Sequence, residues 1–105
     1  LQFSLELEGF NVETFESGEA LLLRDDPERD TCLVLDLNLP GVDGLGVIRE
    51  FRRRGVEAPA LLITSHPRPS VRSGATDLGA VIVEKPLLGD HLLGAIQSAL
   101  KPTLF

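Results

Sequence analysis

Short, almost wholly apolar runs alternate along the chain with longer segments in which apolar residues recur at helical spacing. The apolar runs lie at 32–37, 60–64 and 81–84. A continuous apolar run is typical of a strand buried on both faces, as in a parallel sheet. The segments between these runs have room for the helices that connect parallel strands. The alternation predicts an α/β domain with a parallel sheet covered by helices on both faces.

Three segments carry clear helix signals. We expect one helix to be capped by Ser17 and to run to residue 24, where an Asp-Asp-Pro turn stops it. A second is expected to begin at Asp43 or Gly44, with apolar residues on one face, and to end at Gly55. The third is expected over 89–101, where leucine, isoleucine and alanine recur at helical spacing.

Three further segments are less regular. Residues 1–8 alternate like a strand but are rich in glutamate and are followed by a Gly-Phe pair typical of a helix end, so we predict a helix there. Residues 11–15 alternate enough to predict a strand. Residues 66–78 contain two prolines and a glycine, which predicts only a short or irregular helix.

Composition limits the class of protein. The chain has 105 residues, 43% of them hydrophobic, which is enough for one domain with its own core. Its net charge of −6 argues against direct binding of nucleic acid, and we interpret the basic run 52–54 as cations at a helix end. A single cysteine, Cys32, fits a reducing compartment, and no apolar run is long enough for a membrane span. A cytoplasmic location is therefore expected, with no membrane partner.

Each predicted strand ends at a polar residue that is able to take part in chemistry. These residues are Asp36, Thr64 and Lys85. The carboxyl ends of parallel strands lie along one edge of the sheet, so we expect the three side chains to converge there. A carboxylate is able to attack a phosphoryl group, a hydroxyl to donate to a phosphoryl oxygen, and an ammonium to neutralise developing charge. Mg²⁺, held by carboxylate and carbonyl oxygens, normally accompanies such chemistry.

Three motifs in this order resemble those of the response-regulator receiver domain. They are Leu-Asp-Leu-Asn-Leu-Pro-Gly-Val-Asp-Gly at 35–44, Leu-Ile-Thr-Ser-His at 62–66 and Val-Glu-Lys-Pro at 83–86. The chain is most similar to receivers that precede a DNA-binding output domain. The resemblance implies a flavodoxin-like, doubly wound parallel sheet whose first β-strand is missing from this chain. The expectation is thus a single receiver-like domain over 1–105, incomplete at its N-terminus.

The resemblance also implies a role for each matching residue. Asp36 corresponds to the phosphoacceptor and to a metal ligand, and Asn38 to the position whose backbone carbonyl binds Mg²⁺. Thr64 corresponds to the switch hydroxyl that follows the phosphoryl group, and Lys85 to the lysine that pairs with that group. Pro86 corresponds to a proline preceded by a cis peptide bond.

The resemblance implies a cofactor and partners as well. Mg²⁺ is expected for the intact family, but the acidic pair that ends the family's first strand has no match here, so we expect this chain to lack most of the protein ligands. The implied partners are a sensor histidine kinase, a DNA-binding output domain in a longer chain, and a second copy in a homodimer. The domain would be a phosphoacceptor in signalling and not an enzyme, beyond phosphorylating and dephosphorylating itself.

Two alternatives stay open at this point. One is a degenerate receiver that is not phosphorylated and acts as an interaction or dimerisation module. The other is a phosphatase similar to the haloacid dehalogenases, which also use an aspartate at a strand end, a hydroxyl and a lysine. That family has a second acidic residue two positions after its nucleophile, where this chain has Asn38.

Overall fold

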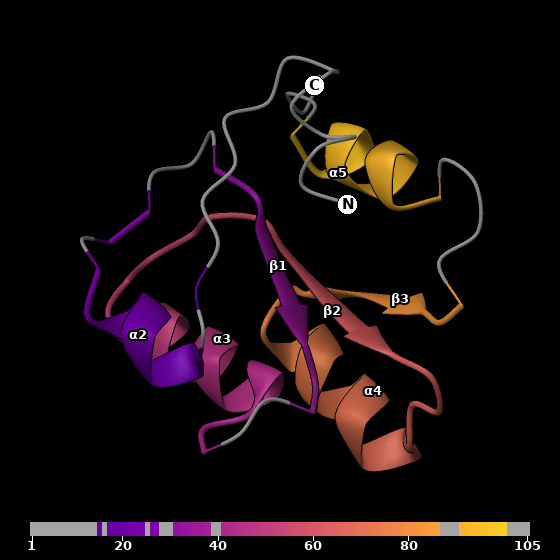
Figure 1. The fold of residues 1–105 in the computed structure, drawn as a ribbon, viewed down its shortest axis with the longest axis horizontal. Coiled ribbons are helices and arrows are strands. Elements are labelled where there is room, and N and C mark those ends of the chain that lie inside the picture. Colours follow the sequence, from indigo (N-terminus) through magenta and orange to yellow (C-terminus); the bar gives the residue numbers. More distant parts are fainter. Residues whose placement is uncertain are drawn as a thin grey trace.

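The protein contains a parallel β-sheet with helices on both faces (Figure 1). The structure is a computed structural model that describes residues 15, 17–24, 26–27, 31–38, 41–86 and 91–100. Within these residues, the elements in chain order are α2 (Gly18–Leu22), β1 (Leu33–Asp36), α3 (Gly44–Arg53), β2 (Ala60–Thr64), α4 (Pro69–Asp77), β3 (Val81–Glu84) and α5 (His91–Leu100).

The described strands form one sheet in the order β1-β2-β3, and both pairs are parallel. All three apolar runs are strands, as predicted. β2 and β3 have the predicted bounds, whereas β1 is one residue shorter at each end than the run 32–37. The α/β fold with a parallel sheet is therefore confirmed.

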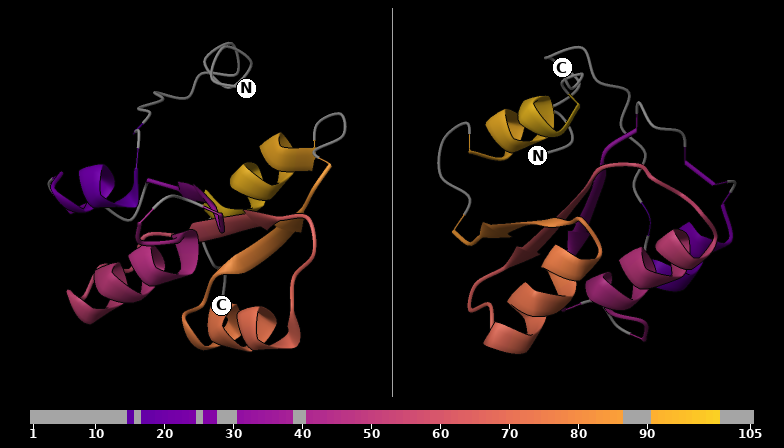
Figure 2. Two further views of the ribbon diagram at one scale, coloured as in Figure 1. Left: turned by 60° about the horizontal axis from the view of Figure 1, so that its bottom comes forward. Right: turned by 180° about the vertical axis from the view of Figure 1, so that it is seen from behind.

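Each face of the sheet has its own apolar cluster. Side chains alternate between the faces along each strand. One cluster packs beneath α3 and α4 and contains Leu33, Leu35, Ala60 and Leu62, with Ile82 packed against it. The other lies beneath α5 and contains Leu61, Ile63 and Val83, with Cys32 and Val34 packed against it. Figure 2 shows α3 and α4 on one side of the sheet and α5 on the other.

Helix α3 has the predicted start and buried face. The Asp43 carboxylate accepts a hydrogen bond from the backbone N–H of Gly46 (2.8 Å), which caps the helix. Val47, Ile48 and Phe51 are completely buried against the sheet. Gly55 follows the helix with a φ of 85°, a conformation that favours glycine at a helix end.

Helix α2 is shorter than predicted. Ser17 caps it, accepting a hydrogen bond from the backbone N–H of Ala20 (3.1 Å), but the helix ends at Leu22 and not at residue 24. The predicted helix over 1–8 lies outside the described residues, as does all of the predicted strand 11–15 except Phe15. The last helix, expected over 89–101, is observed as α5, and residues 89, 90 and 101 are not among those described.

The helix predicted over 66–78 as short or irregular is observed, and it is short but not irregular. Helix α4 is regular over nine residues and begins at Pro69. Proline at the first helical position loses no intrahelical hydrogen bond and already has the required φ. A Cβ atom at Gly74 would come within 3.1 Å of Leu45 Cδ2, so glycine allows α4 to pack closely against α3. None of the described helices has the length and apolar character needed to cross a bilayer.

Two arginines at the C-terminal end of α3 bind carbonyl groups of the neighbouring helices and of the segment that follows α3. Arg52 donates to the carbonyl oxygens of Leu78 (2.8 Å) and Val56 (2.9 Å), and Arg54 donates to that of Leu22 (3.0 Å). Leu78 is the C-cap of α4 and Leu22 is the last residue of α2, and neither helix has a basic residue in its own last turn. We call Arg52, Arg54 and these carbonyls the arginine brace. It agrees with the interpretation of the basic run as a helix end.

Candidate functional site

The carboxyl edge of the sheet brings Asp36 and Lys85 into direct contact. Asp36 is the last residue of β1, and Lys85 follows the last residue of β3. The Lys85 Nζ atom lies 2.7 Å from Asp36 Oδ2, and the two side chains are 39% and 37% exposed. β1 and β3 are separated by β2 in the sheet. The two residues meet because the strands are parallel, so that β1 and β3 end at the same edge.

The Asp36 carboxylate has a second hydrogen bond. Its Oδ1 atom accepts from the backbone N–H of Asn38 (2.9 Å), in the turn that follows β1. Desolvation alone would raise the pKa of Asp36, but the hydrogen bonds from Lys85 and Asn38 and the positive charge of Lys85 outweigh it and hold that pKa below its ordinary value. Asp36 is therefore ionised at neutral pH, as a nucleophile must be.

Thr64 lies at the predicted strand end but is only 2% exposed. Its backbone carbonyl accepts a hydrogen bond from the Lys85 backbone N–H (2.9 Å), which fixes the start of the segment after β3. Among the described residues, no hydrogen bond joins the Thr64 hydroxyl to Asp36 or Lys85. The peptide bond between Lys85 and Pro86 is cis, as the resemblance implies.

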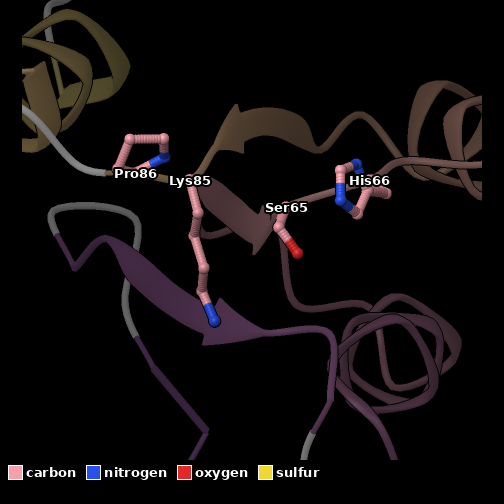
Figure 3. Close-up of a pocket in the computed structure, with 4 residues that line it drawn as sticks. All are labelled: Ser65, His66, Lys85 and Pro86. Atoms are coloured by element: carbon pink, nitrogen blue, oxygen red, sulfur yellow. The ribbon is translucent and has the colours of Figure 1, made fainter.

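An open hollow of about 590 Å³ lies beside the Asp36–Lys85 pair. Ser65, His66, Lys85 and Pro86 line it (Figure 3). The sequence predicted roles for Lys85 and Pro86, but no role was predicted for Ser65 or His66, which line the same hollow. Ser65 and His66 directly follow β2, whose carboxyl end lies at the same sheet edge as Asp36 and Lys85, and this position in the sequence could have indicated them.

The loop after β1 is held by helix α2. The Glu19 carboxylate accepts a hydrogen bond from the backbone N–H of Val42. Gly41 has a φ of 71°, and a Cβ atom there would come within 2.5 Å of Glu19 Oε1. At Gly44, a Cβ atom would lie 2.5 Å from the Asp36 carbonyl oxygen. Glycines at 41 and 44 thus permit the close turn that presents Asp36 at the sheet edge.

The two groups that the resemblance assigns to a metal ion, the Asp36 carboxylate and the Asn38 backbone carbonyl, both belong to described residues. Both are oxygen ligands, which Mg²⁺ prefers. However, the described part of the chain contains no group of three or more His, Cys, Asp or Glu side chains placed to hold a metal. These residues therefore fit only part of a magnesium site.

Comparison with known proteins gives a consistent result. The model of the family described as "Response regulator receiver domain" matches residues 1–97. The Transcriptional regulatory protein FixJ of Bradyrhizobium diazoefficiens is 32% identical over 102 residues, covering 96% of this chain and 50% of FixJ. Response regulator MprA of Mycobacterium leprae is 35% identical over 104 residues, covering 98% of this chain and 46% of MprA. The chain thus spans about half the length of these relatives.

Solved structures agree with these matches. The crystal structure of FixJ-N superposes with a TM-score of 0.82 at 29% sequence identity, over 98% of this chain and 83% of that one. The fold and the sequence match both favour a receiver over a phosphatase. The chain belongs to the response regulator receiver domain family.

Proposed function

We propose that Asp36 accepts a phosphoryl group and that Lys85 binds this group once it is transferred. The observation that carries the proposal is the 2.7 Å contact between Lys85 Nζ and Asp36 Oδ2 at the carboxyl edge of the sheet. A carboxylate with a lowered pKa and an adjacent ammonium, both more than a third exposed, are accessible to a donor from solvent.

The donor that fits this family is the phosphohistidine of a sensor histidine kinase. An Asp36 carboxylate oxygen forms a new bond to phosphorus while the bond between phosphorus and the imidazole nitrogen breaks. The imidazole keeps the electron pair of that bond and takes up a proton. Lys85 then shifts its ion pair from the carboxylate to the phosphoryl oxygens and neutralises the charge that develops on them.

Receiver domains generally bind Mg²⁺, and in this chain Asp36 and the Asn38 carbonyl are the groups that would contribute to holding it. When bound, the ion would neutralise phosphoryl oxygens. Since the described residues provide only part of its ligand set, we assign no step of the transfer to the metal.

The relatives suggest the wider setting. FixJ is a transcriptional regulatory protein, and this chain covers half of it. The proposed output is therefore a change in contacts with a DNA-binding domain in a longer protein, in the cytoplasm. A homodimer is a second route by which phosphorylation would be read out.

Phosphorylation of the full protein tests the proposal. Incubation with acetyl phosphate and Mg²⁺ should give one aspartyl phosphate at Asp36, detected by mass spectrometry after borohydride reduction. Asp36→Asn should abolish the modification, whereas Asp77→Asn, an exposed carboxylate on α4, should leave it intact. Absence of modification in the wild-type protein would reject the proposal and favour the degenerate receiver.

A further inference from the structure

The hydroxyl of Ser65 shares a face of the sheet with Asp36 and Lys85, whereas that of Thr64 does not. On β1, Val34 packs on the α5 side, so Asp36, two residues later, continues on that side. On β3, Val83 packs on the α5 side, and Lys85 follows it by two residues. The ion pair between Asp36 and Lys85 agrees with this alternation.

The same alternation along β2 places Thr64 and Ser65 on opposite sides. Ile63 packs in the α5 cluster, and Ser65 follows it by two residues. Leu62 packs in the α3–α4 cluster, and Thr64 follows it by two residues. The hydrogen bond from the Lys85 N–H to the Thr64 carbonyl (2.9 Å) shows that the strand pairing continues to this point, so the alternation still holds there.

Glu84 provides an independent check on the assignment of faces. It precedes Lys85 and should lie on the α3–α4 side. Its carboxylate is 2.7 Å from Arg72 Nη2, and Arg72 belongs to α4. The two faces therefore remain distinct up to the ends of the strands.

Ser65 is also available for binding. It is exposed, it lines the hollow beside Lys85, and among the described residues no hydrogen bond uses its hydroxyl. Figure 3 shows the Ser65 and Lys85 side chains leaving the ends of their strands on the same side, toward the end of β1. Thr64, by contrast, is 2% exposed as a whole residue, and its side chain lies on the other face of the sheet by the alternation above.

From this arrangement we propose that the Ser65 hydroxyl donates a hydrogen bond to the phosphoryl group on Asp36, beside the Lys85 ammonium. Ser65 is then a phosphoryl-binding residue of the resting fold, and it needs no movement of Thr64. This inference rests on the proposed role of Asp36 as phosphoacceptor.

The test is binding of beryllofluoride, a phosphoryl analogue, to the full protein with Mg²⁺, followed by calorimetry or NMR. We expect Ser65→Ala to raise the half-saturating concentration about tenfold, the effect of losing one hydrogen bond to a charged group. Ser65→Thr, which keeps a hydroxyl, should stay close to the wild type. Ser70→Ala, an exposed serine in the first turn of α4, is the matched control and should not change binding.

The outcomes separate the two proposals. If the wild-type protein binds beryllofluoride and Ser65→Ala binds equally well, the role of Ser65 is rejected and that of Asp36 stands. A Ser65→Thr variant as weak as Ser65→Ala also rejects it. If the wild-type protein does not bind the analogue, the phosphoacceptor proposal fails and the Ser65 proposal fails with it. Thermal melts of each variant show that the fold is retained.

Discussion

The two edges of the sheet use charged side chains in opposite ways. At the carboxyl edge, the Lys85 ammonium makes one ion pair within the described part of the chain, with Asp36, and both side chains are more than a third exposed. At the other edge, Arg52 donates to two carbonyl groups, and Arg54 donates to Leu22, Glu50 and Asp26. The guanidinium groups of Arg52 and Arg54 use their N–H donors within the protein and so stabilise the fold. The Lys85 ammonium, which is exposed, has N–H donors left for a ligand.

The largest effect expected from this contrast is on phosphoryl transfer in Lys85→Ala. Loss of a preorganised charge at a reacting group typically lowers the rate by a factor of about 10². Stability should change by at most about 1 kcal/mol, because the pair with Asp36 is exposed. Rates of labelling by acetyl phosphate and urea denaturation measure the two effects. A large loss of stability without a loss of rate would break the contrast.

The opposite pattern is expected for Arg52→Ala. Two part-buried carbonyls would lose a charged donor, which should lower the free energy of unfolding by about 1–3 kcal/mol. The phosphorylation rate of the folded fraction should be unchanged, because Arg52 lies at the far edge. Urea denaturation gives the first quantity, and labelling at saturating donor concentration gives the second.

A smaller loss of stability is expected for Arg54→Ala, and Arg53→Ala is its matched control. Arg54 donates to the Leu22 carbonyl and lies over the Phe51 ring, 5.7 Å from its centroid. Arg54→Ala should therefore cost about 1 kcal/mol of stability. Arg53 is bonded to Glu50 alone in the described part of the chain, and its side chain is 72% exposed, so Arg53→Ala should change the melting temperature little. Equal losses of stability in the two variants would show that the arginine brace does not stabilise the fold.

The smallest expected effect is on the acid titration of Asp36. Because its pKa in the folded protein lies below the unfolded value of about 3.9, the interaction with Lys85 contributes stability above that pH. The contribution is lost as the pH falls through the folded pKa. Lys85→Ala should move the pKa of Asp36 upward, measured by NMR of its carboxyl carbon. An unchanged pKa would show that Lys85 does not act on Asp36 in solution.

Much of the fold could be predicted from the local pattern of apolar and capping residues. The apolar runs predicted all three described strands, and the Asp43 cap predicted the start of α3, because these signals depend on neighbouring residues alone. The regularity of helix α4 was not predicted, since the effect of Pro69 depends on whether it falls at the first helical position or inside the helix.

The site was only partly readable. The contact of Asp36 with Lys85 follows from two strand ends on one sheet edge, which the sequence indicates. The role proposed for Ser65 depends on the face assignments of three strands at once, whereas the family motif predicts a role only for Thr64, which stays a prediction. The partners of Arg52 were unpredictable from the sequence, because carbonyl acceptors on other elements carry no residue-type signal.

The arginine brace has a consequence for how this domain tolerates sequence change. Arg52 and Arg54 bind main-chain oxygens at Leu78, Val56 and Leu22, and every amino acid has such an oxygen. Substitutions at those three acceptor positions leave the bonds intact, so no compensating change at an arginine is needed. Arg72 and Glu84, by contrast, each need the other's side chain. In an alignment of relatives, the second pair should covary, while the brace should appear as arginines that persist beside freely varying acceptors.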